Sequence, residues 1–206
     1  MSIRESLSDS PSERLSVFSK IRLLVLARLW YTISMKYDYL TLYQKNADFY
    51  NAHPRAKRAL QLGNTLLTAF FLFSYALLWI FALFIDSLEP QSLLVISFVP
   101  AVCLFVVCVL RWAIDKPRPY AVGGAGITPF VQKKKQDNKS FPSRHTACAF
   151  VIAITFTAFY PIIGGFLIAL AALLAYVRFA AGLHYPSDLF AGGLIGSLIG
   201  GLAFLL

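Results

Sequence analysis

The stretch TACAFVIAITFTAFYPIIGGFLIALAALLAYV, residues 146–177, contains no charged side chain. It is longer than the roughly 20 residues with which a helix crosses a bilayer. Tyr160-Pro161 and Gly164-Gly165 interrupt it near its middle, and proline and glycine commonly mark helix breaks and turns. The stretch therefore predicts two short membrane helices joined by a tight turn.

Other apolar runs lie on both sides of this stretch. Two of them, residues 59–85 and 91–110, are each predicted to form one span. A last run extends from Pro186 to Leu206, and proline is suited to the first turn of a helix. Strand-like alternation is not found. We expect an all-α integral membrane protein whose residues 59–206 form a helical bundle of five transmembrane spans.

The composition agrees with a membrane protein. Of 206 residues, 58% are hydrophobic and 14% charged, and the mean hydropathy is +0.65. A soluble domain of this size is not expected to have such values. The net charge of +9 indicates contact with anionic lipid head groups or an anionic substrate. Nucleic acid is not an expected partner, because no soluble domain presents a basic face.

The N-terminal region differs from the rest of the chain. Residues 1–14 are polar and expected to be disordered, and no signal peptide is evident. Residues 15–39 are apolar on average but interrupted by cations, each of which costs roughly 2.5–3.5 kcal/mol at the centre of a span. The pattern favours an amphipathic helix in the membrane interface over a sixth span. We assign residues 15–58 to this helix and to a polar connector, 44–58, that ends in Arg55, Lys57 and Arg58.

Glycine and cysteine positions add two expectations. The last helix carries small residues at helical spacing, which predicts close packing against another helix: Gly192, Gly193, Gly196, Gly200 and Gly201. The three cysteines lie within apolar runs and lack the spacing of metal ligands: Cys103, Cys108 and Cys148. Their odd number argues against a disulfide framework.

Three polar clusters stand at the ends of apolar runs. They are RWAIDKPRP (111–119), FPSRH (141–145) and RFAAGLHYPSD (178–188). Because successive spans alternate in direction, all three clusters fall on the same membrane face. Ionisable residues at a membrane edge are functional candidates, so the topology predicts one site built from three distant segments.

The residue types in these clusters suit phosphate chemistry. Arginine guanidinium groups match phosphate oxygens, and the helix that opens after Pro142 directs free backbone N–H groups toward an anion. His145 and His184 can act as general acid and nucleophile, and Asp188, four residues after His184, can orient its ring. We expect no metal cofactor, because carboxylates near the clusters are too few for a two-metal site. Lys116 is expected to be solvated or to contact head groups.

At this point the three clusters resemble the signature of the type 2 phosphatidic acid phosphatase superfamily, whose pattern is Lys-x6-Arg-Pro, Pro-Ser-Gly-His and Ser-Arg-x5-His-x3-Asp. The resemblance implies a helical membrane enzyme that removes phosphate from a lipid phosphate. It implies that His184 forms a phosphohistidine, that Asp188 orients it, and that His145 protonates the leaving alkoxide. The phosphoryl oxygens would be bound by Arg111, Arg118, Ser143, Arg178 and the backbone of Arg144.

The sequence departs from that pattern at three positions. Arg111 stands in place of lysine, Arg144 in place of glycine, and Val177 in place of the serine before Arg178. None of these departures removes a catalytic atom, so they bear on substrate choice rather than on chemistry.

We predict a phosphatase for a lipid phosphomonoester of the phosphatidic acid or phosphatidylglycerophosphate type. A polyprenyl diphosphate phosphatase, a phosphotransferase and a non-catalytic protein that binds anionic lipid are the alternatives. The positive-inside rule would place the basic connectors, and the active site with them, in the cytoplasm. The family resemblance favours an extracytoplasmic active site in the cell membrane, and we adopt that side. The partners expected are the lipid substrate and membrane lipids; the oligomeric state is left open.

Overall fold

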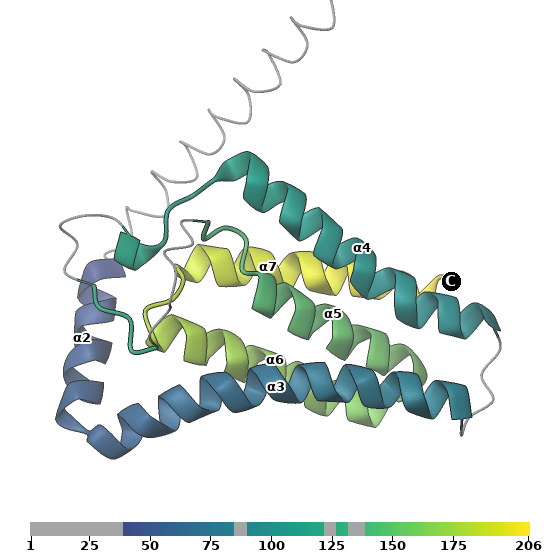
Figure 1. The fold of residues 1–206 in the computed structure, drawn as a ribbon, viewed down its shortest axis with the longest axis horizontal. Coiled ribbons are helices and arrows are strands. Elements are labelled where there is room, and N and C mark those ends of the chain that lie inside the picture. The colour runs from purple at the N-terminus through teal and green to yellow at the C-terminus, as the bar shows by residue number, and fades with distance from the viewer. Residues whose placement is uncertain (1–38, 85–89, 122–126, 132–138) are drawn as a thin grey trace, which may run out of the picture. The chain divides into compact units, whose positions relative to one another are not determined.

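The computed structural model describes residues 39–84, 90–121, 127–131 and 139–206, in which every regular element is helical (Figure 1). The predicted interfacial helix, apart from its last residue Tyr39, and the lysine run 133–135 lie outside these residues. The elements are α2 (Tyr39–Ala52), α3 (Pro54–Phe84), α4 (Pro90–Ile114), η1 (Pro119–Ala121), α5 (Arg144–Phe159), α6 (Pro161–Ala180), α7 (Pro186–Gly200) and η2 (Gly201–Phe204).

Within the residues that the structure describes, four segments are long and apolar enough to cross a membrane: Pro54–Phe84, Gln91–Ala121, Pro161–Ala180 and Pro186–Phe204. Helix α5, with 16 residues, is shorter. The outward-facing apolar side chains are large, and Phe73, Phe105 and Leu198 each leave about two thirds of their surface uncovered. Such a continuous apolar surface is suited to lipid rather than water. The integral membrane class is thus supported, and the fifth span stays a prediction.

The uncharged run 146–177 divides where the sequence predicts, but at only one of its two candidate breaks. Helix α5 ends at Phe159 and Pro161 opens α6, since a proline at the first helical position needs no N–H partner. Gly164 and Gly165 lie inside α6. The predicted connector 44–58 requires a correction, because it is helical: α2 continues to Ala52 and α3 begins at Pro54. Charged residues such as Arg55 and Lys57 are good helix formers, and polarity alone does not indicate a loop.

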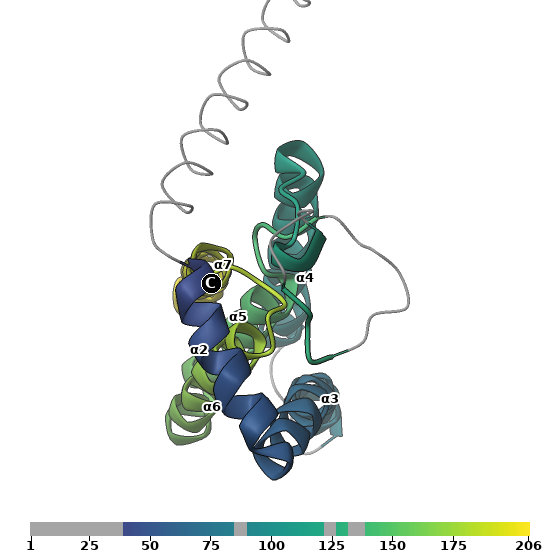
Figure 2. The ribbon, with the colours of Figure 1, turned by 90° about the vertical axis from the view of Figure 1, so that its left-hand side faces the viewer.

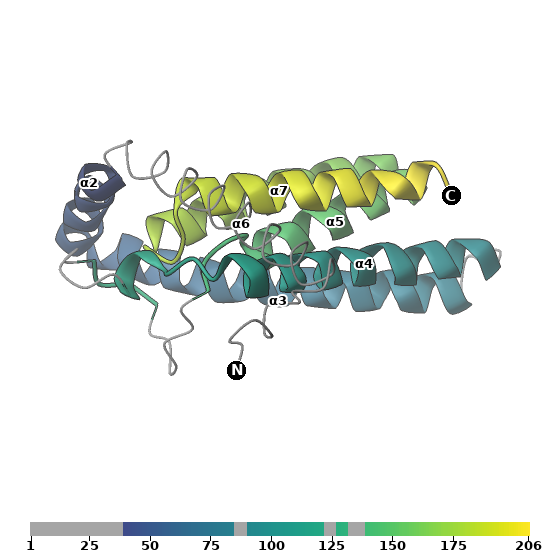
Figure 3. The same ribbon diagram turned by 90° about the horizontal axis from the view of Figure 1, so that it is seen from above.

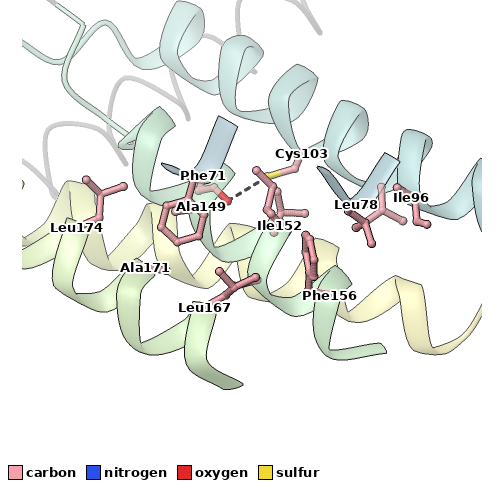
Figure 4. Close-up of a cluster of buried hydrophobic side chains, with 14 of the residues drawn as sticks. Phe71, Leu78, Ile96, Cys103, Ala149, Ile152, Phe156, Leu167, Ala171 and Leu174 are labelled. Atoms are coloured by element: carbon pink, nitrogen blue, oxygen red, sulfur yellow. Dashed lines mark hydrogen bonds between the residues drawn. The ribbon is translucent and has the colours of Figure 1, made fainter. Parts of the chain in front are cut away.

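Helix α5 is the central element of the bundle. It contacts α7, α6, α4 and α3, and the view along the bundle shows it between α4 and α6 (Figure 2). Helix α2 lies across the end of the bundle where α3 begins and α4 ends (Figure 3). The buried side chains shared by these helices come from α3, α4, α5 and α6, among them Phe71, Leu78, Ile96, Ile152 and Leu174 (Figure 4). In a bilayer such close packing supplies the attraction between helices that the hydrophobic effect does not.

The glycine pattern of α7 produces the predicted close contact with α5. A Cβ atom on Gly192 would lie 2.6 Å from the carbonyl oxygen of Ser143, and one on Gly200 would lie 2.8 Å from Cβ of Ile154. Gly196 meets the backbone of Ala147 in the same way. A Cβ atom on Gly201 would have no described atom within 4 Å, so this glycine does not take part. The contact brings the start of α7 to the start of α5, where the backbone N–H of Ser143 donates to the carbonyl of Asp188 at 2.9 Å.

Candidate active site

The three polar clusters meet at the end of the bundle that α2 covers (Figure 1). They come from the C-terminal ends of α4 and α6 and the N-terminal ends of α5 and α7. The charged and polar side chains buried there include Arg111, Arg118, Ser143, Arg178, His184 and Asp188. His145 is half-buried and Arg144 is exposed. The structure therefore brings together the segments that carry all eight predicted site residues.

His184 lies in the turn between α6 and α7 and is 1% exposed. Its Nδ1 is 3.1 Å from the carbonyl oxygen of Ser140, a contact in which the ring nitrogen must carry the proton and donate. The other nitrogen, Nε2, then presents a lone pair. Nε2 is buried and has no hydrogen-bond partner among the described residues. This arrangement suits a nucleophile, because the lone pair is available to an electrophile.

Burial lowers the pKa of His184 to about 3, and the positive charges of Arg178 and Arg118 lower it further, against the opposing effect of Asp188. A buried imidazole cannot easily take up a proton, because the charged form loses its hydration. His184 is consequently neutral at physiological pH, which is the form that can attack phosphorus.

Asp188 is fully buried, and its carboxylate accepts hydrogen bonds from three sides. Lys116 Nζ lies 2.8 Å from Oδ1, while the hydroxyl of Ser140 and the backbone N–H of Tyr185 donate to Oδ2 at 2.5 and 3.2 Å. The distance from Oδ2 to Nδ1 of His184 is 3.8 Å, beyond a hydrogen bond. Ser140 stands between the two, with its hydroxyl on the carboxylate and its carbonyl on the ring. It orders both side chains at once.

Lys116 is the first site residue that sequence reasoning missed. The prediction that it is solvated or bound to head groups is wrong: its side chain is buried between the rings of Tyr185 and Phe141, 4.4 and 5.8 Å from Nζ to the ring centroids. Its ammonium group also donates to the hydroxyl of Ser187 at 3.2 Å. One signal could have found it, because a carboxylate buried with a neutral histidine needs a cation as partner.

Two arginines lie close enough to His184 for their charges to act on it. Arg178, in the last turn of α6, donates from its Nη1 to Asn64 Oδ1 at 3.1 Å, and its buried Nε has no partner in the described part of the chain. Arg118 donates to the carbonyl of Leu183, next to His184, at 3.5 Å. Asn64 is the second residue that sequence reasoning missed. An amide inside an otherwise apolar span is the signal that it carries a function.

Arg111 contacts the chain rather than an open space. Its guanidinium donates to the carbonyl oxygens of Pro142 at 3.0 Å and of Ser140 at 3.4 Å, and also to that of Lys139. The planar fork of an arginine reaches several acceptors in fixed directions, which a lysine cannot. Arg111 thus fixes the segment that carries Ser140 and leads into Ser143.

The start of α5 borders two cavities that share His145. One cavity, of about 350 Å³, is lined by Arg178, Asn64 and Leu183 as well as His145. The other, of about 320 Å³, is mostly apolar and lies against Phe71, Leu104 and Ile152, with His145 and Arg144 at its polar side. Ser143 is buried, and its hydroxyl is 3.0 Å from that of Thr146. His145 therefore stands where two mostly apolar cavities adjoin, one with Arg178 and the other with Arg144 in its lining.

Helix α2 supports the turn that holds His184. The hydroxyl of Tyr39 donates to the carbonyl of His184 at 3.4 Å, and its ring packs on Tyr185 with centroids 4.9 Å apart. Gly182 in the same turn has a φ of +70°, a conformation that costs a residue with a side chain strain energy. A Cβ atom there would also collide with the ring of Tyr43.

The family model of the PAP2 superfamily matches residues 92–206. The Escherichia coli (strain K12) protein YbjG, named as a candidate undecaprenyl-diphosphatase, is 32% identical over 127 residues, which are 61% of this chain and 60% of that protein's length.

Two crystal structures resemble the fold. LpxE of Aquifex aeolicus has a TM-score of 0.62 and 26% identity, covering 79% of this chain and 94% of its own. A PAP2-type phosphatidylglycerolphosphate phosphatase of Bacillus subtilis has a TM-score of 0.68 over 92% of both chains. At 20% identity, the second likeness shows the fold alone.

Proposed function

This chain belongs to the PAP2 superfamily, and from that premise we propose that it is a membrane lipid phosphate phosphatase whose nucleophile is His184. The observation that carries the proposal is the buried Nε2 of His184, which has no partner in the described residues. The neutral ring lies beside Arg118 and Arg178, whose charges act on it. A phosphoryl group is the ligand that such a pair of guanidinium groups next to a lone pair would fit.

The reaction would proceed in two displacements. Nε2 of His184 attacks phosphorus while the bond from phosphorus to the leaving oxygen breaks, and His145 gives that oxygen its proton. Arg118 and Arg178, with Ser143 and the backbone N–H of Arg144, stabilise the charge on the phosphoryl oxygens. A water molecule then attacks the phosphohistidine, His145 takes up a proton from it, and inorganic phosphate leaves.

Arg111, assigned to phosphate binding by the family resemblance, would contribute through the segment 139–142 that its hydrogen bonds hold. Asp188 would act in a similar way. Its carboxylate fixes Ser140, and the Ser140 carbonyl fixes the Nδ1–H of His184. The imidazolium character that develops during attack is stabilised by both acceptors.

We further propose that no metal takes part. In the described segments no three His, Cys, Asp or Glu side chains gather to hold an ion, and Asp188 is already paired with Lys116. Phosphate release that persists in excess EDTA supports the proposal, whereas activity that requires added Mg²⁺ contradicts it.

Two classes of substrate are proposed for this site, and the first is a lipid phosphomonoester of the phosphatidic acid or phosphatidylglycerophosphate type. A polyprenyl diphosphate is the second candidate, and the similarity to YbjG favours it. Purified protein in detergent, assayed with these lipids for released inorganic phosphate, distinguishes the two. Release of phosphate in this assay also excludes the alternative of a protein that only binds anionic lipid, since such a protein would release no phosphate.

The decisive variant is His184→Asn, which keeps a neutral amide in the turn but has no nucleophilic nitrogen. We expect phosphate release to be abolished, and the ³²P label that wild-type protein retains after acid-free quenching to disappear. The His184→Asn protein must elute at the wild-type position on size-exclusion chromatography. Full activity in this variant would end the proposed mechanism.

The active site is proposed to face the extracytoplasmic side. Helix α2 lies at the active-site end of the bundle, and the start of α4 lies at the other end (Figure 3). Asn51 in α2 and Gln91 in the first turn of α4 are both exposed. Single cysteines at these two positions, with the three native cysteines replaced, can be tested in whole cells with a membrane-impermeant maleimide. Labelling at position 51 alone supports the proposal, and labelling at position 91 alone reverses it.

A further inference from the structure

The side chain of Arg144 is set apart from the other arginines of the site. It is the first residue of α5 and is exposed, whereas Arg111, Arg118 and Arg178 are buried. It occupies the position at which the family pattern has glycine, so its cation is an addition to the common machinery. Any function of this side chain therefore bears on what this particular protein recognises.

Arg144 and Arg178 line different cavities. Arg178 borders the cavity of about 350 Å³ and Arg144 the cavity of about 320 Å³; both are mostly apolar, and His145 borders both. Leu72 and Thr68 are also shared, so the two cavities adjoin. A molecule that reaches from one to the other passes His145.

If the protein has the function proposed above, the two cavities would hold different parts of the substrate. The phosphoryl group that reacts lies with His184 and Arg178. The oxygen that His145 protonates belongs to the leaving group, which must then continue into the second cavity. Its chain would lie along Phe71, Leu104 and Ile152, and its first atoms beside Arg144.

A cation at that point selects among leaving groups by charge. Diacylglycerol or a prenol presents a neutral oxygen there, with which a guanidinium gains little. A leaving group that is itself a phosphate presents an anion that guanidinium binds in a bidentate manner. Arg144 is also at the N-terminal end of α5, where the positive end of the helix dipole favours a bound anion as well.

We propose that Arg144 binds the phosphate carried by the leaving group and thereby selects lipid diphosphates over lipid monophosphates. In the reaction, Nε2 of His184 takes the terminal phosphoryl group and the bond from its phosphorus to the bridging oxygen breaks. That oxygen leaves as part of the lipid monophosphate, held by Arg144. Water then releases inorganic phosphate from His184, so that one diphosphate and one water give one lipid monophosphate and one phosphate.

The test compares substrates that differ by one phosphate in the leaving group. Farnesyl diphosphate and farnesyl monophosphate form the first pair, and phosphatidylglycerophosphate and phosphatidic acid the second. The second pair places the additional phosphate one glycerol unit away from the reacting group. For each pair, the quantity measured is the ratio of the two kcat/KM values in detergent.

Arg144→Gln removes the charge but keeps a side chain of similar reach, and Arg144→Lys keeps the charge. We expect the farnesyl ratio to fall about tenfold in Arg144→Gln, the effect of one lost charge-assisted contact, and to fall less in Arg144→Lys, which keeps the charge but not the bidentate fork. Arg58→Gln is the matched control, because Arg58 is an exposed cation of α3 outside both cavities. Its ratio should equal that of the wild type.

An unchanged farnesyl ratio in Arg144→Gln overturns the inference while leaving the proposed function intact. A fall confined to the phosphatidylglycerophosphate pair overturns the assignment to diphosphates, because the second phosphate would then be recognised at the longer spacing. If wild-type protein releases phosphate from none of the four lipids, the proposed function itself fails. The three results are distinguishable in a single set of assays.

Discussion

Lys116 and Asp188, 72 residues apart in the chain, form a buried ion pair with 2.8 Å between Nζ and Oδ1. The pair ties the segment after α4 to the first turn of α7 and so joins the first and third polar clusters directly. Because Asp188 also accepts from Ser140, and Ser140 accepts from His184, the ion pair lies at the base of the hydrogen-bond chain that orients the nucleophile. Lys116 is accordingly a positioning residue for the proposed reaction.

Lys116→Met should destabilise the protein by about 3 kcal/mol, because it leaves the Asp188 carboxylate buried without a counter-charge. The double variant Lys116→Met/Asp188→Asn removes that unpaired charge and should recover most of the lost melting temperature, measured in detergent by differential scanning fluorimetry. Its phosphatase activity should remain low, since no carboxylate is left to hold Ser140. If the double variant were no more stable than Lys116→Met, the unpaired Asp188 carboxylate could not be the cause of the lost stability.

Ser140→Ala should lower kcat about tenfold or more and change KM little. The substitution removes the hydroxyl that holds Asp188 but keeps the backbone carbonyl that holds His184, so substrate still binds while the carboxylate loses its fixed orientation. Ser97→Ala is a suitable control, because the Ser97 hydroxyl donates to the carbonyl of Leu93 one turn earlier in α4. Steady-state kinetics of both variants check this, and wild-type kcat in Ser140→Ala would contradict it.

The lowered pKa of His184, about 3 against an ordinary 6.5, predicts a pH-dependent stability. Between these two values the unfolded chain binds a proton that the folded protein rejects, so the free energy of unfolding falls as the pH is lowered, by up to about 1.4 kcal/mol per pH unit. Above pH 6.5 this residue contributes no slope. Melting temperatures of wild-type and His184→Asn protein from pH 7.5 to 5 should therefore diverge, with the wild type losing more. If the melting temperatures of the two proteins changed in parallel with pH, the pKa of His184 would not be lowered in the folded protein.

Gly196→Ala should destabilise the bundle, because the added Cβ would meet the backbone carbonyl of Ala147 and lie 2.9 Å from Cβ of Phe150. Backbone cannot move aside as a flexible side chain can, so α7 must separate from α5 and carry Asp188 with it. Gly165→Ala in α6 is the matched control, since no atom of the described residues lies within 4 Å of its added Cβ. There the melting temperature should stay level or rise slightly, as expected for alanine replacing glycine in a helix. Equal effects of the two substitutions would disprove the role of close packing.

The membrane class, the division of the long apolar run at Pro161, the close packing of α7 and the convergence of the three clusters on one end could all be predicted from the sequence. They depend on hydropathy, on the conformational limits of proline and glycine, and on the alternation of spans, which are local or topological properties. The prediction of a connector at 44–58 is wrong because charged residues form helices readily, and the proline in this segment, Pro54, stands at the start of α3, where it is tolerated.

The residues that would carry phosphoryl chemistry were visible in the sequence because arginine, histidine and aspartate are rare beside membrane spans and recur at fixed spacing. Only the tertiary structure decided their partners. Lys116 with Asp188, Asn64 with Arg178, and Ser140 between Asp188 and His184 each join different helices or loops, and no periodicity relates one chain position to the other. Hydrogen bonds and ion pairs depend on distances of a few tenths of an ångström, which are set by how closely the glycines of α7 allow it to approach α5, and that approach exists only in the folded bundle.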